Sequence, residues 1–417
     1  MERIAAACLA LLALAGCGAT SDELKQAPYD CRQRNYDAPE AIAACDVLLA
    51  RYSTPEQRAA YLAARGVAYG RVGRTEEAMA DLNAALELDP GLTNARLERA
   101  KLEEKLGQTA AARADYNRVL ADGPWIVDAR VGRARLDIET GQHATAVADL
   151  NEAVTLRPER SDAWLLLGTA HRRGGDMAAA AADYGKAMAL RPDAANLYLA
   201  RAGTLFQLGD YPAALADVDA AISREPNSAD AYNQRGRIEA AQGNVDQALA
   251  DFTKAVALDP GLADAYRNRG NVLVKQGELD AAIADFGLAI ERAPDSAASY
   301  LSRADALAKK GDDRAAMRDL DEAIRLDPEN PVAFVTRGNV RVRLGNLRPA
   351  IADFTKAIAL RPNFAAAFYG RGRAYVLEND LRPARADFTQ ALRLDPKLEA
   401  AQRQLDNVAR LEAKLAG

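Results

Sequence analysis

Apolar and polar positions recur along the chain with a period of 34 residues, starting at Ala59. Each period contains an alanine, an aspartate three residues later and a proline nine residues after that. The alanines stand at 78, 112, 146, 180, 214, 248, 282, 316, 350 and 384, the aspartates at 81, 115, 149, 183, 217, 251, 285, 319, 353 and 387, and the prolines at 90, 124, 158, 192, 226, 260, 294, 328, 362 and 396. A fixed period of this length, repeated ten times, predicts a solenoid of small helical units.

Each period predicts two short helices. In the seventh period the first helix is expected from about 264 to 276 and the second from about 279 to 292, with Pro294 preventing its continuation. A glycine follows the first helix in nine periods, where it favours a left-handed helix cap, and Asn379 replaces it in the tenth. The glycines are at 73, 107, 141, 175, 209, 243, 277, 311 and 345.

Small residues also occupy one place within every first helix, which carries only glycine or alanine. A larger side chain there is expected to push the two helices of a period apart. The set comprises Gly66, Ala100, Ala134, Gly168, Ala202, Gly236, Gly270, Ala304, Gly338 and Gly372.

These periodic residues resemble the tetratricopeptide repeat (TPR) family over residues 59–398 of the 417. The resemblance implies an all-α fold, a right-handed α-solenoid superhelix of ten 34-residue helix-turn-helix repeats. It also implies a concave groove lined by the first helices.

The segments on either side of the array predict two caps. Residues 37–52 resemble a second helix of the repeat, so residues 29–58 are expected to form a helical N-terminal cap. Residues 399–417 predict a C-terminal capping helix, which solenoids need to cover their last exposed face. Its apolar stripe comprises Ala401, Leu405, Val408, Leu411 and Leu415.

The sequence departs from the family pattern by carrying arginine where the family often has leucine in the first helix. One interpretation is a row of ligand-binding arginines, and the other is a ladder that pairs each arginine with the periodic aspartate. Recurrence in otherwise different repeats favours the ladder, because binding surfaces are expected to vary between repeats. The arginines are at 65, 99, 133, 201, 235, 269, 303, 337 and 371, and Leu167 is the exception.

The second and third repeats are irregular because Arg96 and Arg130 replace an aromatic residue. Glu103 and Asp137 follow seven residues later on the same helix face, which predicts compensating charges in a more polar layer.

Composition narrows the function classes. The net charge of −5 argues against nucleic acid as the partner. Two histidines and four cysteines, with no phosphate loop, metal-ligand spacing or nucleophile motif, predict no metal, no cofactor and no small-molecule substrate. The expected protein is therefore not an enzyme.

The N-terminus predicts export. Residues 1–16 hold one basic residue and an apolar run that is too short to span a membrane, as in an export signal. Leu14-Ala15-Gly16-Cys17 resembles the lipobox of bacterial lipoproteins, in which Cys17 would be acylated and followed by a polar tether over 17–28. A plain export signal cleaved after Ala15 and an apolar start of a cytosolic protein are the alternatives. Gly18 resembles the residue that sorts such lipoproteins to the outer membrane.

The other cysteines agree with this interpretation. Cys8 would leave with the signal, so Cys31 and Cys45 remain as one pair, which is expected to form a disulfide in an oxidising compartment. Two buried free thiols are the alternative.

The candidate ligand-binding residues come from family resemblance, which places two positions of each first helix in the groove. These positions carry many bases, opposed there by Glu139 and Asp305, so a net basic groove for an acidic peptide is expected. Ordinary solvated side chains are the alternative. The groove set is Arg71, Lys101, Lys105, Arg135, Arg173, Phe206, Arg237, Arg267, Asn271, Lys275, Lys309, Arg343, Tyr369 and Arg373.

Together these features predict a lipid-anchored scaffold at the outer membrane that faces the periplasm and binds an envelope protein or peptide. A soluble periplasmic or secreted form is the alternative for its location. The alternative function is a structural subunit of a secretion, pilus or outer-membrane assembly complex that packs through its outer surface. A regulatory or catalytic subunit of an envelope enzyme is more distant.

Overall fold

The computed structural model describes residues 31, 37–50 and 54–416, and every regular element in that part of the chain is an α-helix. The predicted signal, Cys17 and the tether lie outside the described residues. The chain divides into two compact units, Met1–Leu208 and Gly209–Gly417, which are considered separately. The predicted all-α helical-repeat fold is confirmed.

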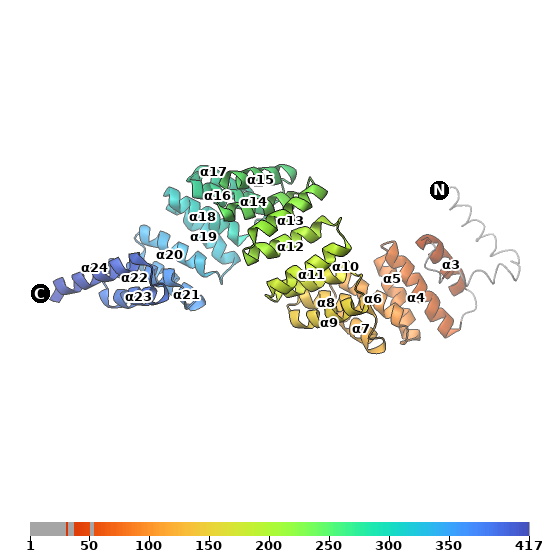
Figure 1. Cartoon of the computed structure of the whole chain (residues 1–417). Helices are drawn as coiled ribbons and strands as arrows, with labels where there is room; N and C mark the ends of the chain where they lie inside the picture. The colour runs from red at the N-terminus through yellow and green to blue at the C-terminus, as the bar shows by residue number, and fades with distance from the viewer. Residues whose placement is uncertain (1–30, 32–36, 51–53, 417) are drawn as a thin grey trace. The chain divides into compact units, whose positions relative to one another are not determined.

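The N-terminal unit stacks successive helices so that each contacts the next along the chain (Figure 1). The helix α3 precedes the array, and the following helices pair as first and second helices of the repeats. They are α3 (Ala38–Ala50), α4 (Pro55–Arg71), α5 (Thr75–Leu88), α6 (Thr93–Lys105), α7 (Thr109–Asp122), α8 (Val127–Glu139), α9 (His143–Leu156), α10 (Ser161–Arg173), α11 (Met177–Leu190) and α12 (Ala195–Leu208).

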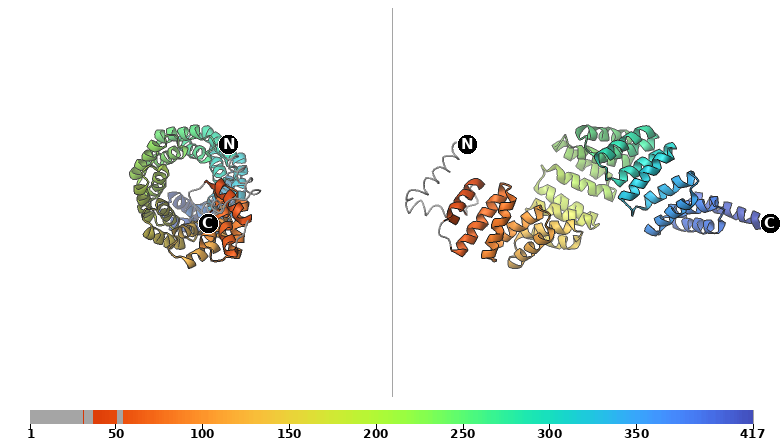
Figure 2. Two further views of the ribbon diagram at one scale, coloured as in Figure 1. Left: turned by 90° about the vertical axis from the view of Figure 1, so that its right-hand side faces the viewer. Right: turned by 180° about the vertical axis from the view of Figure 1, so that it is seen from behind.

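The C-terminal unit is built in the same way and ends in a longer helix, α24 (Figure 2). Its helices are α13 (Tyr211–Arg224), α14 (Ala229–Gln242), α15 (Val245–Leu258), α16 (Ala263–Gln276), α17 (Leu279–Arg292), α18 (Ala297–Lys310), α19 (Asp313–Leu326), α20 (Pro331–Arg343), α21 (Leu347–Leu360), α22 (Ala365–Leu377), α23 (Leu381–Leu394) and α24 (Glu399–Ala416).

The turns between paired helices depend on left-handed backbone. All nine periodic glycines have φ between 72° and 93°, and Asn379 has φ 61°. A residue with a Cβ atom is strained in this region, whereas glycine enters it freely and asparagine tolerates it. The predicted glycine caps are confirmed.

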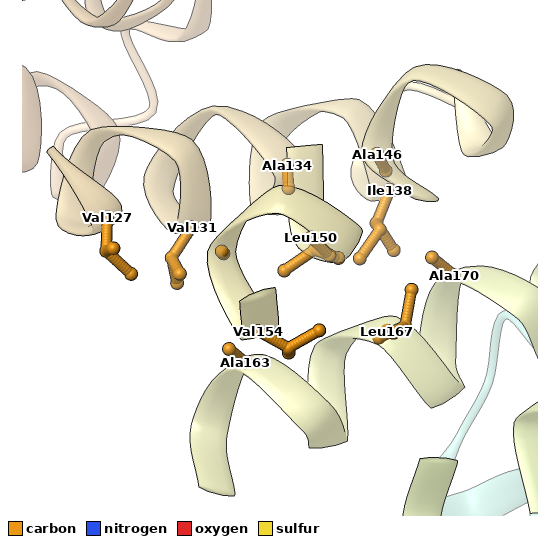
Figure 3. Packing of buried hydrophobic residues seen from close by; sticks show 11 residues of the cluster. Val127, Val131, Ala134, Ile138, Ala146, Leu150, Val154, Ala163, Leu167 and Ala170 are labelled. Atoms are coloured by element: carbon orange, nitrogen blue, oxygen red, sulfur yellow. The ribbon is translucent and has the colours of Figure 1, made fainter. Parts of the chain in front are cut away.

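The paired helices meet at the periodic glycine and alanine positions. A Cβ atom placed on Gly270 would lie 2.7 Å from the Cε1 atom of Phe286, whose side chain is fully buried. Alanine, leucine and valine fill the equivalent layer in the third and fourth repeats, where Leu150 and Leu167 pack against Val131 and Val154 (Figure 3). Helix pairs therefore pack closely enough that side-chain size is restricted at these positions.

Both ends of the array carry a covering helix. At the N-terminal end α3 is tied by a disulfide between Cys31 and Cys45, whose Cα atoms are 5.2 Å apart, consistent with the sequence prediction. At the other end Val408 of α24 is fully buried, and Leu405 and Leu411 pack with it against Leu381 and Phe388. The side chain of Leu415 lies outside the described residues.

Candidate functional site

The periodic arginines form the predicted ladder. In eight repeats the arginine donates two hydrogen bonds, from Nε and Nη2, to both oxygens of the aspartate sixteen residues later, at 2.6–3.0 Å. The aspartates are buried, and the hydrogen bond from Asp285 raises the pKa of Arg269. The pairs are Arg65–Asp81, Arg99–Asp115, Arg133–Asp149, Arg235–Asp251, Arg269–Asp285, Arg303–Asp319, Arg337–Asp353 and Arg371–Asp387.

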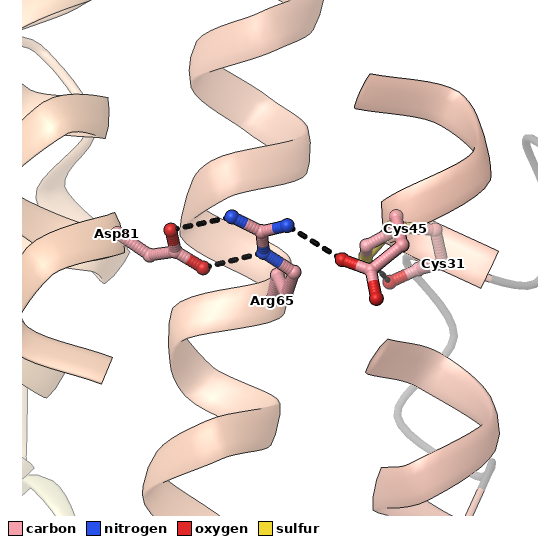
Figure 4. Close-up of a disulfide and its surroundings, with 5 residues drawn as sticks. Cys31, Cys45, Arg65 and Asp81 are labelled. Carbon is pink, nitrogen blue, oxygen red and sulfur yellow. Dashed lines mark hydrogen bonds and ion pairs between the residues drawn. A yellow bond between two sulfur atoms is a disulfide. The ribbon is translucent and has the colours of Figure 1, made fainter. Parts of the chain in front are cut away.

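The remaining nitrogen of the arginine reaches the preceding repeat. The Nη1 atoms of Arg99 and Arg337 donate to Asn83 and Asp321, sixteen residues earlier, each at 2.8 Å. The first arginine, Arg65, instead donates to Asp46 of the cap, so it lies between Asp81 and the disulfide-linked segment (Figure 4). Each such arginine joins three helices, which accounts for its recurrence without a ligand.

The repeat with Leu167 uses a different cation. His171, one turn further along α10, has its Nδ1 atom 2.6 Å from Oδ2 of Asp183. Burial raises the pKa of Asp183, and the hydrogen bond from His171 opposes that shift. The structural role expected of His171 is therefore that of a substitute partner in the ladder.

The prediction of compensating charges in the second and third repeats is wrong in its pairing. Arg96 and Arg130 donate to the carbonyl oxygens of Pro90 and Pro124, six residues earlier. Trp164 and Tyr198 donate to Pro158 and Pro192 in the same way, so the arginines replace the polar atom of an aromatic residue. Helical spacing suggested a contact with Glu103 and Asp137, but the long side chains extend toward the preceding turn.

The two acidic residues have other surroundings. Asp137 is paired with Arg113 of the preceding helix. Glu103 is equally buried, yet its Oε2 atom has no hydrogen-bond partner in the described structure, and Arg99 lies 3.8 Å away. Burial and the nearby Asp115 raise the pKa of Glu103, while Arg99 opposes the shift.

Three hollows lie between neighbouring first helices. The α6 hollow, of about 550 Å³, is lined by Val67, Arg71, Thr93, Asn94, Leu97, Glu98, Lys101, Ile126 and Asp128. The α8 hollow, of about 560 Å³, is lined by Lys101, Glu104, Lys105, Tyr116, Asp128, Val131, Gly132, Arg135, Glu139 and Arg160. The α18 hollow of the C-terminal unit, of about 490 Å³, is lined by Asn271, Val274, Lys275, Leu301, Ser302, Asp305, Lys309, Val332 and Thr336.

The hollows contain part of the predicted groove set. Arg71, Lys101, Lys105 and Arg135 line the two hollows of the N-terminal unit, and Asn271, Lys275 and Lys309 line the α18 hollow. The other predicted groove residues do not line these three hollows. They are Arg173, Phe206, Arg237, Arg267, Arg343, Tyr369 and Arg373.

The expected excess of unopposed bases is wrong for several groove positions. Lys101 pairs with Glu98 at 2.9 Å, and Arg135 pairs with Glu104, which also accepts a hydrogen bond from Tyr116. Farther along, Arg267 pairs with Asp264, Lys309 with Asp305 and Arg343 with Asp313. The sequence count had set only Glu139 and Asp305 against these bases, because it considered two positions per helix.

Some lining residues were not predicted from the sequence. Tyr116 belongs to a second helix and reaches the α8 hollow because Gly132 has no side chain, a Cβ atom there lying 2.5 Å from the tyrosine hydroxyl. Val332 and Thr336 supply apolar and hydroxyl groups to the α18 hollow. The glycine at 132 is the sequence signal that marks the first of these.

Metal and membrane features were also considered. Within the described residues no cluster of histidine, cysteine, aspartate and glutamate has a composition and arrangement suited to a metal ion. None of the helices described is both long and apolar enough to cross a bilayer.

Family profiles match most of the array. Two described as tetratricopeptide repeats match residues 131–196 and 267–331, and residues 59–92 and 365–398. A third, described as a TPR repeat, matches residues 236–277 and 338–379. A sequence comparison with curated proteins found no match.

Solved structures share the architecture. The chain is similar to the APC/C hetero-tetramer Cut9-Hcn1, with 16% identity over 98% of this chain and 92% of that chain and a TM-score of 0.50. Yeast Tom70 has 19% identity over 95% of this chain and 97% of its own, with a TM-score of 0.49. YrrB, described as a TPR protein with an unusual peptide-binding site, has 24% identity over 45% of this chain and 96% of its own, with a TM-score of 0.38.

Proposed function

Because the chain belongs to the tetratricopeptide repeat family, we propose that it is a scaffold which holds a segment of another protein against its first helices. Proteins of this family are generally interaction modules without catalytic activity. The observation that carries the proposal is the position of the three hollows, all of which lie between first helices and outside the ladder.

The lining of the α18 hollow suits an extended peptide. Val274, Leu301 and Val332 offer apolar surface, while Lys275 and Lys309 place positive charge at the rim. Lys309 is paired with Asp305 on its own helix, an exposed pair that contributes little stability and exchanges readily for a ligand carboxylate. A segment with neighbouring apolar and acidic side chains fits this combination.

Charge reversal in the α18 hollow tests the proposal. Lys275→Glu combined with Lys309→Glu should abolish the partner crosslinks that the unmodified protein forms in the cell envelope, measured by mass spectrometry. The matched control is Lys254→Glu with Lys356→Glu, because these exposed lysines lie on second helices. An unchanged set of partners in the hollow variant contradicts binding at this site.

A second candidate function, packing through the outer surface, has one specific observation in its favour. Trp125 is 69% exposed in the turn before α8, beside Leu156 at 44%. The same turn position holds glycine, a polar residue or a charged residue in the other nine repeats. Loss of the captured partners in Trp125→Ser, with no loss in the lysine variant, favours this second function.

The location is part of the proposal. An exported protein anchored by lipid on Cys17 is supported by the lipobox resemblance of residues 14–17 and by the Cys31–Cys45 disulfide, since such bonds persist in oxidising compartments. Two or more acyl chains would hold the protein at a membrane lastingly, whereas one binds reversibly. Cys17→Ala should move the protein from the membrane fraction to the soluble periplasmic fraction. Unchanged membrane retention contradicts the anchor.

A further inference from the structure

A fourth hollow lies where the cap meets the array. This cap hollow, of about 240 Å³, has walls from α3, α4 and α6 and from Cys31. Alanines, Val67 and Leu92 form most of its surface, and Arg71 is the one charged residue that lines it. Arg71 and Asn94 also line the neighbouring α6 hollow, so the two hollows share an edge.

The cap hollow is open because of one short side chain. Ala63 contributes to its floor, and the nine later repeats all carry a larger residue at the corresponding place. These residues are Leu97, Val131, Leu165, Leu199, Asn233, Arg267, Leu301, Val335 and Tyr369. The difference of several carbon atoms leaves apolar surface uncovered, although Ala63 and Val67 pack on buried Leu82 and Leu86 from the other side.

The disulfide supports the opposite wall. Cys31 and Cys45 are buried together with Tyr61, and Ala64 packs against this cluster. Closing the loop of fourteen residues between the cysteines restricts the cap in the unfolded and the locally opened chain. The cap hollow therefore depends on a covalent bond that reduction would break.

The polar edge defines the chemistry of an occupant. Arg71 is exposed and has no ion-pair partner among the described residues, unlike Lys101 and Arg135 farther along the same unit. Its guanidinium group presents several donors in a plane that matches a carboxylate. The amide of Asn94, at the same edge, can bond to a peptide backbone.

We infer that the cap hollow is a separate anchoring site for a partner segment, taking an apolar side chain next to an acidic residue whose carboxylate binds Arg71. This inference rests on the proposed function, because it places one end of the bound segment at the cap. Burying a leucine-sized side chain corresponds to about a tenfold to hundredfold gain in affinity.

The binding test uses defined probes and the full mature chain. Fluorescent eight-residue peptides, blocked at both ends, carry Leu and Glu at neighbouring positions, and matched peptides carry Ser for Leu or Gln for Glu. Fluorescence anisotropy should show binding of the Leu/Glu peptide that is about tenfold or more tighter than that of either matched peptide. Equal affinities for the three peptides overturn the inference.

Filling the cap hollow supplies the decisive variant. Ala63→Leu introduces the residue that four other repeats carry at this place, so it should fold and yet weaken peptide binding about tenfold. Ala298→Leu, an exposed position on α18 outside the hollows, should leave affinity unchanged. Arg71→Gln should weaken only the peptide that carries glutamate. Undiminished binding in Ala63→Leu overturns the inference, as does a crosslink from Asn94 to the chain's own N-terminal segment.

A redox comparison tests the role of the wall. Reduction, or Cys31→Ser with Cys45→Ser, should weaken binding of the Leu/Glu peptide while circular dichroism shows the array still helical. Equal affinity of the oxidised and reduced chains contradicts dependence on the disulfide. If Ala63→Leu has no effect but the Lys275 and Lys309 variant loses its partners, the proposed function stands and the cap inference fails. If neither variant matters, the proposed function fails as well.

Discussion

At the residue scale, the recurring arginines are explained by what surrounds each aspartate. Asp285 is 5% exposed, and Arg269 satisfies both of its oxygens while a third bond reaches Thr253 of the preceding repeat. Removing one partner of a buried ion pair leaves an uncompensated charge, which is more costly than never having had the pair. The ladder therefore fixes the register of the helices more than it adds stability.

The ladder predicts the effect of copying the histidine arrangement. Arg269→Leu should lower the free energy of unfolding by about 2 kcal/mol, because Asp285 loses its cation in a partly exposed setting. Adding Leu273→His, which reproduces the spacing of Leu167 and His171, should recover about half of that loss. Denaturant unfolding followed by circular dichroism measures both. A double variant less stable than Arg269→Leu contradicts the role assigned to His171.

Glu103 predicts a pH effect of opposite sign. Its pKa is raised in the folded state by burial, so the folded chain holds the proton more tightly than the unfolded chain does. The charged form therefore costs stability above the raised pKa, and that cost disappears as pH falls through it. Glu103→Gln should raise the free energy of unfolding at pH 7 by about 1 kcal/mol, and the gain should shrink toward pH 4.

Exposed Glu139 provides the control for this pH effect. Glu139→Gln should change stability by less than about 0.5 kcal/mol at either pH. A destabilised Glu103→Gln protein at pH 7 would mean that attraction to Arg99 outweighs the burial of the charge.

At the element scale, the two helices of a repeat match each other in size. Gly236, Gly270, Gly338 and Gly372 each face a buried phenylalanine, at 252, 286, 354 and 388. Where the first helix instead has Ala134 or Ala304, the residue sixteen positions later is Leu150 or Leu320. The small residue and the large one thus compensate for each other within a pair of helices.

This match predicts a rescue. Gly270→Ala should destabilise the protein by about 1–3 kcal/mol, since the new methyl group would overlap the ring of Phe286. Combining it with Phe286→Leu copies the pair Ala304 and Leu320, and the double variant should be more stable than Gly270→Ala alone. Thermal unfolding monitored by calorimetry distinguishes the two. Additive losses in the double variant contradict the size match.

At the scale of the whole molecule, the sequence predicted what recurs and missed what does not. The turns at Gly277 and Asn379 and the pairing of Arg269 with Asp285 follow from a period of 34 residues, since each repeat meets the same neighbours. The partners of Lys101 and Arg135 do not recur, because Glu98 and Glu104 are particular to one repeat. The hollows likewise depend on single residues such as Ala63 and Gly132, whose effect appears only when the neighbouring side chains are in place.

The central claim is that partners bind the face formed by the first helices. A photo-crosslinking amino acid introduced at Ser302, in the α18 hollow, compares directly with one at exposed Lys254 on the second helix α15. Irradiation of intact cells should join a defined partner protein to the chain from Ser302 and none from Lys254. Capture of the same partner from Lys254, with none from Ser302, would contradict the account.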